Sequence, residues 1–200
     1  WCHDVSEKNK NLHSIESLPF WAQKTLGEHA DDIRHCETYE DLIHANTRDR
    51  FWNACQKNLL CHGELHNNLR LTWGKMLLHW TKDPQTCLRY LIDINHRFAL
   101  DGRDPASYGG ILGCLGLFDR PCKPEMEITG TVRQRLSSLH ANRLNIEELE
   151  QKISENQKRE IRIGVIGAGL SGLTCATHLH KFGVHVDIFD KGREVGGRTS

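Results

Sequence analysis

The sequence has no net charge and no long apolar run, and each absence excludes a class of protein. Lys plus Arg and Asp plus Glu both number 26 among 200 residues. No field over the whole molecule therefore attracts nucleic acid, so any such binding needs a local patch. No apolar run approaches the ~18–20 residues of a transmembrane helix. With 38% hydrophobic and 26% charged residues, the composition is typical of a soluble globular protein of one large or two small domains.

Paired cysteines are lacking too. None of the eight cysteines forms a Cys-x-x-Cys pair and we expect no signal peptide, so we expect neither a disulfide framework nor a zinc site. Reduced thiols that mostly fill the core are expected, and with them an intracellular protein. The cysteines are Cys2, Cys36, Cys55, Cys61, Cys87, Cys114, Cys122 and Cys175.

The thirteen histidines are scattered as well. His62 and His66 have a spacing that suits a metal on one helix face, with Glu64 between them. Gly63 interrupts the pair, and the glutamate is not where a zinc protease needs it. We therefore expect no metal site.

Both ends of the chain are unusual. Position 1 is Trp1, and the chain stops at Ser200, directly after a loop of the cofactor-binding type. These features predict a fragment of a longer protein, cut at each end.

Apolar periodicity and capping residues predict a mainly helical first part. Residues 1–17 and 119–143 are expected to be irregular, and residues 100–105 form a turn-rich loop. A charged helix over residues 145–159 is expected to be a solvated linker. The expected helices cover Leu18 to Ala30, a short stretch from the N-cap Thr38 to Ala45, Phe51 to Leu60 with a stop near Gly63, Glu64 to Trp80, and Pro84 to Phe98.

The pattern changes after residue 160. A strand over 161–166, a glycine loop, a helix from near Leu170 and a strand over 184–189 predict a β-α-β unit. In the loop, Gly167 permits a tight turn, Gly169 lets a pyrophosphate approach the backbone, and Gly172 allows close helix–strand packing. Asp190 ends the second strand, where a carboxylate accepts ribose hydroxyls. The alternative is a glycine loop that merely packs the unit.

The residues that follow indicate which cofactor the loop binds. The run from Val186 to Lys191, with Gly196, Gly197 and Arg198 soon after it, resembles the flavin amine oxidase family. The resemblance covers about residues 160–200 and implies FAD, with the Gly-Gly-Arg loop near its diphosphate. The family usually has Glu where this chain has Asp190. One β-α-β unit cannot bury both faces of a parallel sheet, so we expect no oxidase catalysis from this chain alone.

Tryptophans concentrate in the helical part. Trp73 and Trp80 lie seven residues apart on one expected helix, which places them on one face about 10 Å apart along the axis. Trp52 lies on the preceding helix and is expected to pack against that face. On spacing alone, a core aromatic cluster is the favoured interpretation.

The sequence around these tryptophans suggests another role. The runs Trp21–Leu26, Phe51–Gln56, Gly63–Lys75 and Leu100–Pro105 occur in order. They resemble the FAD-binding helical domain of the DNA photolyase/cryptochrome family, nearest its class II branch, from about residue 18 to 148.

The resemblance implies specific roles. Arg70 pairs with Asp101 beside the flavin ring, Asn95 faces flavin N5, and Trp73, Trp52 and Trp80 pass electrons to the photoexcited flavin. Two positions depart from the family pattern. Gly113 stands where the family has a Trp that packs against the pyrimidine dimer, which implies binding weaker by ~1–3 kcal/mol. Ala106 replaces a class II Asn. We also expect the antenna domain and the early helices that bind the flavin phosphates in this family to be missing.

Three hypotheses follow. The first is a photolyase-like protein that uses FAD for light-driven electron transfer to pyrimidine dimers in damaged DNA, in impaired form. In the second, the helical part is an interaction module of an amine-oxidase-like FAD oxidoreductase. The third is an inactive gene fragment. The expected architecture is an incomplete helical domain (18–143), a linker helix (144–160) and a truncated Rossmann start (161–200).

Overall fold

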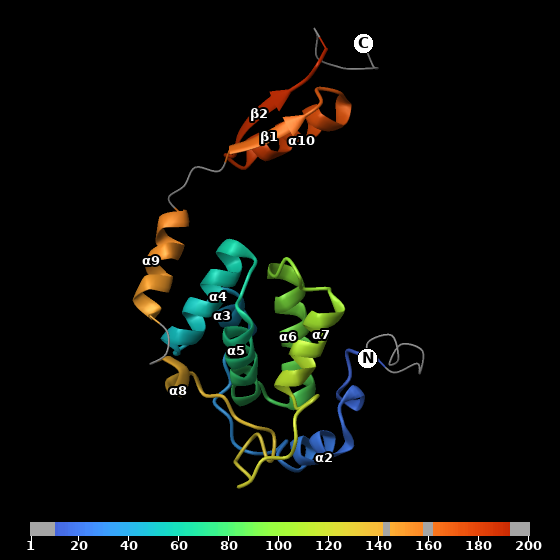
Figure 1. Ribbon diagram of the computed structural model, residues 1–200, viewed down its shortest axis with the longest axis vertical. Helices are drawn as coiled ribbons and strands as arrows, with labels where there is room; N and C mark the ends of the chain where they lie inside the picture. The colour runs from blue at the N-terminus through green and yellow to red at the C-terminus, as the bar shows by residue number, and fades with distance from the viewer. Residues whose placement is uncertain (1–10, 142–144, 158–161, 193–200) are drawn as a thin grey trace. The chain divides into compact units, whose positions relative to one another are not determined.

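The computed structural model describes residues 11–141, 145–157 and 162–192. The chain divides into two compact units, residues 1–153 and 154–200, of which the first is helical and the second carries both strands (Figure 1). The helical unit contains η1 (Ile15–Ser17), α2 (Phe20–Glu28), α3 (Tyr39–Ile43), α4 (Arg50–His62), α5 (Asn67–Trp80), α6 (Pro84–Phe98), α7 (Pro105–Cys114), α8 (Ser137–Ala141) and most of α9 (Ile146–Gln157).

Helix α5 is the centre of this unit. It contacts α4, α6, α7 and α8, and every residue from Thr72 to Leu78 is buried. A helix buried on all sides is a core element rather than an amphipathic surface helix. Gly74 makes this packing possible, because a Cβ atom there would lie 2.5 Å from Cys114 Sγ on α7 and 3.3 Å from a methyl group of Leu91 on α6.

Local signals begin and end the helices largely as expected. Thr38 accepts a hydrogen bond from the Asp41 N–H at the start of α3, and Pro84 opens α6. Gly63 ends α4 with a left-handed φ of 68°. The expected helix from Glu64 instead starts at Asn67, because the His66 side chain caps it by accepting from a backbone N–H.

One helix lies where none was assigned, and another lies in a stretch expected to be irregular. Residues 105–114 form α7, which Pro105 opens directly after the N-cap Asp104, and α8 interrupts the irregular stretch 119–143. Among the described cysteines, Cys55, Cys87 and Cys114 are buried, whereas Cys36, Cys61 and Cys175 are exposed. Core filling therefore accounts for only some of the thiols.

The charged helix α9 is attached to the helical unit along one side. Arg50, at the start of α4, forms ion pairs with Glu147 at 3.1 Å and Glu150 at 2.7 Å. Ile153 is 3% exposed. The expected solvated linker helix thus has one face bound to α4 and one face in solvent, where Lys152 pairs with Glu148.

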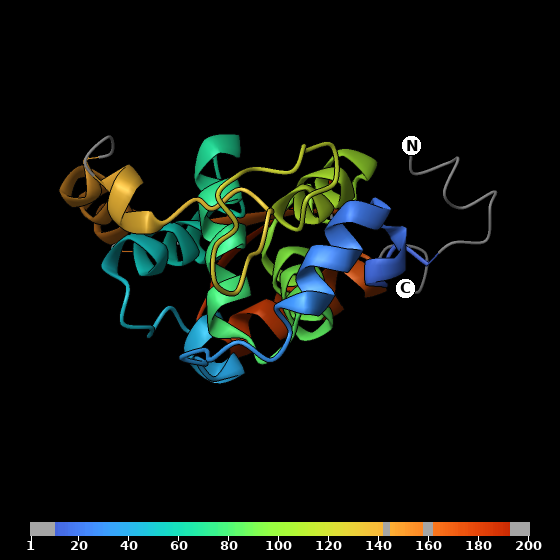
Figure 2. The same cartoon turned by 90° about the horizontal axis from the view of Figure 1, so that it is seen from below.

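The long stretch between α7 and α8 is held against the helices by polar contacts. Figure 2 shows it crossing over α5. Lys75, buried on α5, donates to the carbonyl of Arg133 at 3.0 Å and lies 3.3 Å from the Asp119 carboxylate. A buried lysine requires such partners, so this stretch completes the core despite its irregular backbone.

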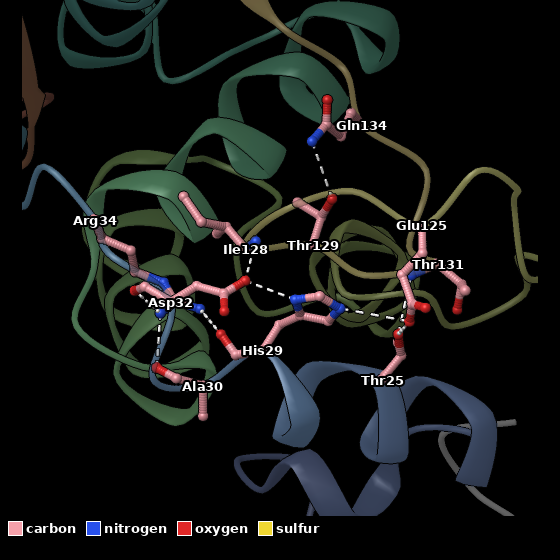
Figure 3. Close-up of polar contacts among 10 residues, drawn as sticks. All are labelled: Thr25, His29, Ala30, Asp32, Arg34, Glu125, Ile128, Thr129, Thr131 and Gln134. Atoms are coloured by element: carbon pink, nitrogen blue, oxygen red, sulfur yellow. Dashed lines mark hydrogen bonds and ion pairs between the residues drawn. The ribbon is translucent and has the colours of Figure 1, made fainter.

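A second anchor joins the same stretch to the end of α2 (Figure 3). His29 Nδ1 lies 2.6 Å from Asp32 Oδ2 and Nε2 lies 3.4 Å from Glu125 Oε1. The same Asp32 oxygen accepts the Ile128 N–H at 2.7 Å. The hydrogen bond to Asp32 raises the pKa of His29, against the opposing effect of burial. The Ile128 N–H, followed by His29, lowers the pKa of Asp32.

The second unit is built from β1 (Arg162–Ile166), α10 (Leu170–Lys181) and β2 (His185–Phe189). The strands are parallel, with Arg162 opposite His185 and Ile166 opposite Phe189. This is the expected β-α-β unit. Ile166 is 93% exposed and Phe189 is 60% exposed, so in the described residues the two-stranded sheet does not cover its own apolar side chains.

The His29 contacts predict a pH dependence. Because folding raises the pKa of His29 above its unfolded value of about 6.5, its stabilising contribution is complete below that pH and is lost as the pH rises through the folded value. We expect the urea midpoint of the native chain, measured relative to that of His29→Gln, to fall as the pH rises above about 6.5. His35→Gln, an exposed histidine outside the contact, is the control. Equal slopes for His29→Gln and the native chain would contradict the prediction.

Candidate functional site

Arg70 and Asp101 form the ion pair that the sequence predicts. Arg70 lies on α5 and Asp101 in the loop after α6, and the guanidinium donates two parallel hydrogen bonds of 2.8 and 2.9 Å to the carboxylate. Arg70 lowers the pKa of Asp101. The Arg70 side chain is 16% exposed, and its buried Nε has no acceptor among the described residues. The fork therefore fixes the guanidinium and leaves one inward donor unused.

Asn95 lies next to this pair, on the last turn of α6. It is 1% exposed, and its amide donates to the Gly102 carbonyl and to Ser107 Oγ, both at 2.9 Å. Ser107 Oγ also accepts from Arg70 at 3.2 Å. A Cβ atom at Gly102 would collide with the Asn95 carbonyl, which explains the Asp-Gly pair in this loop. The structure thus brings Arg70, Asp101 and Asn95 together.

Ser107, which joins them, was not predicted from the sequence. It lies in the first turn of α7, where a serine is an ordinary residue, and nothing local indicates that its hydroxyl points to α5 and α6.

A cavity of about 950 Å³ lies beside this cluster, between α5, α7 and the stretch that follows α7. One wall is the glycine-rich face of α7, and a Cβ atom at Gly110 or Gly113 would meet nothing within 4 Å. Gly113 and Ala106, the two positions that depart from the photolyase pattern, both line it. The lining residues are Asn67, Leu71, Lys75, Pro105, Ala106, Gly109, Gly110, Gly113, Leu117, Phe118, Asp119, Arg133, Gln134, Arg135 and His140.

Basic side chains predominate in the cavity wall, and the predicted residues Arg70, Asp101 and Asn95 are connected to that wall through another side chain. Lys75, Arg133 and Arg135 outnumber the single carboxylate, Asp119. Arg70, Asp101 and Asn95 are not lining residues; they connect to the wall through Ser107, the neighbour of Ala106 in α7. An anionic ligand with a flat apolar part suits such a cavity.

The three tryptophans form one continuous row. Trp52 stacks on Trp73 with ring centroids 5.9 Å apart and an interplanar angle of 9°. On its other side it meets Trp80 edge-on at 5.6 Å. Trp52 and Trp73 are fully buried and Trp80 is partly exposed. The row therefore runs from the core, one helical turn from Arg70, to the surface at the end of α5.

Two hydrogen bonds fix the inner rings of this row. The Trp52 indole N–H donates to the Trp73 carbonyl at 2.9 Å, and the Trp73 indole N–H donates to Gln56 Oε1 at 3.1 Å. Gln56, on α4, is 0% exposed. Gln56 was not predicted from the sequence, where its only local signal is a polar side chain one turn after Trp52.

The glycine loop of the second unit has the geometry expected of a dinucleotide loop. Gly167 has a φ of 102°, and a Cβ atom at Gly172 would collide with the Gly167 carbonyl. Gly169 is the N-cap of α10, with open space where a Cβ would lie and no side chain capping the helix. Backbone N–H groups at the start of α10 are thus left for an anion.

Asp190 ties the end of β2 to this loop. Its carboxylate accepts from the N–H groups of Ala168 and Gly192, both at 2.6 Å, and these bonds lower its pKa. Gly196, Gly197 and Arg198 lie outside the described residues. Their assignment to the flavin diphosphate stays a prediction.

The histidine pair weighed for a metal is split between helices. His62 ends α4 and His66 caps α5. Within the described ranges, no three His, Cys, Asp or Glu side chains come together as a metal site. Across the same part of the chain, no helix combines the length and apolarity needed to cross a membrane.

The Arg70–Asp101 fork predicts a measurable stabilisation. In Asp101→Asn the charge is lost at constant shape, and we expect the free energy of unfolding at neutral pH to fall by about 1 kcal/mol, a low value because the carboxylate is half exposed. Since folding lowers the pKa of Asp101, this difference is present above the unfolded value of about 3.9 and vanishes in acid. Urea titrations at several pH values measure it. Glu148→Gln, in an exposed ion pair with Lys152, is the control, and an equal loss there would contradict the prediction.

Comparison with known proteins finds relatives for the helical part. Over 121 residues the chain is 40% identical to a deoxyribodipyrimidine photo-lyase of Methanothermobacter thermautotrophicus, covering 60% of this chain and 27% of that protein. Over 148 residues it is 38% identical to the deoxyribodipyrimidine photo-lyase of Potorous tridactylus, covering 73% of this chain and 28% of that protein. The chain thus spans about a quarter of the length of these relatives. A match over 73% of the chain necessarily includes the central segment with Arg70, Asn95 and Asp101.

The C-terminal part has different relatives. Residues 165–200 match the NAD(P)-binding Rossmann-like domain. Over 45 residues the chain is 47% identical to UacF of Escherichia coli, a protein named as an oxidoreductase, covering 22% of this chain and 7% of that protein. The chain is therefore homologous to the deoxyribodipyrimidine photolyases over its helical part and to NAD(P)-binding Rossmann-like domains over its C-terminal part.

Proposed function

We propose that the helical unit is part of a photolyase-type flavoprotein that acts on pyrimidine dimers in damaged DNA, with FAD as its cofactor. The observation that carries this proposal is the row Trp73, Trp52 and Trp80, which leads from the surface to within one helical turn of the Arg70–Asp101 pair. An aromatic cluster that only fills the core does not require its rings to run in sequence from a buried position to the surface. Homology to proteins named deoxyribodipyrimidine photo-lyase supports the same function.

The residues present suit a flavin. The unused, buried Nε of Arg70 is a donor without an acceptor, and such groups call for one. The cavity of about 950 Å³ is of the size that ligand sites have, roughly 300–1,000 Å³. The bare backbone of α7 at Gly110 and Gly113 accepts a flat ring. When bound, FAD would supply a light-absorbing ring that exchanges single electrons.

Each polar side chain then has a role that follows from its contacts. The Arg70 guanidinium favours negative charge on a neighbouring ring, and Asp101 holds that guanidinium in one orientation. Both N–H groups of the Asn95 amide are engaged, which leaves its carbonyl oxygen to accept a hydrogen bond from a ligand N–H. Ser107 couples the two by accepting from both.

The basic residues in the cavity wall suit the binding of DNA phosphates. Arg133 and Arg135 have no carboxylate partner among the described residues, and together with Lys75 they give the cavity a positive rim despite a chain of zero net charge. Phosphates bind to such local patches. Gly113 leaves open the place where the photolyase resemblance implies a stacking tryptophan. We therefore infer that this chain holds a dimer weakly.

A second function is favoured by the C-terminal unit. The open loop at Gly169 and the uncapped start of α10 suit the diphosphate of a dinucleotide, with Asp190 beside the loop. The match to an NAD(P)-binding Rossmann-like domain supports an oxidoreductase of which the helical unit is an interaction module. FAD is the dinucleotide that the resemblance to flavin amine oxidases implies.

Replacing the first tryptophan of the row separates these functions. Trp73→Phe keeps an aromatic ring but removes the easily oxidised indole next to the flavin. We expect blue-light reduction of bound FAD to slow by about tenfold or more, equivalent to at least ~1.4 kcal/mol of barrier, measured by absorbance under steady illumination. Trp21→Phe, on α2 and outside the row, is the control. Flavin that binds but shows no light-driven reduction in the native chain would contradict the photolyase proposal and favour the oxidoreductase.

Gly113→Trp tests the DNA site. The position faces the cavity and has room for a Cβ, so the new indole offers a stacking surface. Stacking is worth about 1–3 kcal/mol per base; we therefore expect roughly 5- to 150-fold tighter binding of an oligonucleotide with one thymine dimer, measured by fluorescence anisotropy. Undamaged DNA and Gly27→Trp, at an open glycine on α2, are the controls. An equal gain in affinity for undamaged DNA would contradict the proposal that the thymine dimer binds in this cavity.

A further inference from the structure

Phe118 stands in a turn position that suits glycine rather than phenylalanine. The turn follows α7 and is closed by the Asp119 N–H, which donates to the Gly116 carbonyl at 3.1 Å. Phe118 is the third of its four residues and has a left-handed φ of 64°. Glycine or asparagine usually takes such a position, because the left-handed backbone is strained for a bulky side chain. The local backbone therefore gives no reason for an aromatic residue here.

Burial gives no reason for the aromatic residue either. Phe118 is 70% exposed, although a phenyl ring stabilises a fold mainly by being covered. Both neighbours in the turn are anchored, because Leu117 is buried and the Asp119 carboxylate lies 3.3 Å from Lys75 Nζ. The turn thus presents an exposed ring from a fixed backbone, and strained positions of this kind occur where a protein holds a ligand.

The Phe118 ring lies at the mouth of the cavity beside α7. Its Cε2 atom is 3.5 Å from the place where a Cβ atom at Gly109 would lie, so one edge of the ring rests on the bare backbone of α7. Phe118 and Gly109 both line the cavity. Because most of the side chain stays exposed, at least one face of the ring is open to a flat group that enters from solvent.

Basic side chains line the same cavity. Arg133 and Arg135 are both lining residues, and Arg133 is exposed. An aromatic ring that stacks on a base, together with cations that contact the phosphates beside it, makes a site for single-stranded nucleic acid. In a duplex each base is covered on both faces by its neighbours, so only a base outside the duplex stack can lie on Phe118.

We propose that Phe118 is the stacking residue of a site for undamaged single-stranded DNA at the mouth of the cavity, with Arg133 and Arg135 on the phosphates. The inference rests on the proposed photolyase-type function for the choice of DNA as the nucleic acid. The base lies at the exposed rim, apart from the half-buried Gly113, where the dimer would stack. A strand that carries a dimer also carries undamaged bases, so this contact offsets part of the binding that Gly113 costs.

The first test removes the ring at a position where glycine fits. Because glycine suits the left-handed backbone, Phe118→Gly should keep the native urea midpoint. It should bind a fluorescein-labelled oligothymidine about fivefold or more weakly than the native chain, measured by fluorescence anisotropy. Phe118→Trp restores a stacking surface and should retain the affinity. Phe20→Ala, which removes an exposed ring from α2 outside the cavity, is the control.

A strand without bases separates stacking from charge and needs no variant. An abasic oligonucleotide of the same length keeps every phosphate, so the native chain should bind it about fivefold or more weakly than oligothymidine. On this strand Phe118→Gly should cause no further loss, whereas Arg133→Gln should weaken the binding of both strands. Unchanged affinity of Phe118→Gly for oligothymidine, or an equal loss on the abasic strand, would overturn the proposal.

Duplex DNA and FAD test the other possible occupants of this ring. The matched duplex should bind more weakly than the single strand and should not respond to Phe118→Gly. If Phe118→Gly instead weakened FAD binding and left oligothymidine binding intact, the ring would serve the cofactor and the proposal would be wrong. None of these titrations needs light or a lesion. A chain that reduces flavin in light but binds no oligothymidine contradicts this inference alone, and the reverse result contradicts the proposed function alone.

Discussion

Burial of α5 on every side is the constraint on which the helical unit depends. The helix carries Arg70, Trp73 and Lys75 within two turns, so its position sets the ion pair, the aromatic row and the cavity wall together. Gly74 is the point of closest approach, because any side chain there would push against Cys114 and Leu91. A small shift of α5 would therefore disturb all three features at once, and none of them can be altered independently through the backbone.

The polar residues on α5 explain why irregular segments are well placed. Arg70 and Lys75 are cations in a mostly dry environment, and each obtains its partners from loops: Asp101 after α6, and Asp119 with the Arg133 carbonyl after α7. The desolvation of these cations is offset only if the loops close over them. Order in the loops is thus a consequence of charge in the core.

Local signals predicted much of the fold, and long-range contacts account for the rest. Thr38, Gly63 and Pro84 mark helix ends through bonds within a few residues, so the sequence alone places them. Ser107 meets Arg70 across 37 residues, and Gln56 meets Trp73 across 17, and no local pattern contains such pairs. The Arg70–Asp101 fork lies between these cases: periodicity did not indicate it, and only the resemblance to photolyases did.

The departures from the photolyase pattern are confined to one place. Gly113 and Ala106 both line the cavity, on the side where a DNA lesion would stack, whereas the Arg70–Asp101 fork, the Asn95 amide and the Trp52–Trp73 stack lie outside it with contacts of their own. Under the proposed photolyase-type function, these two positions would weaken the hold on DNA, whereas the contacts between α4, α5 and the loop after α6 that would serve the flavin are unaffected by them.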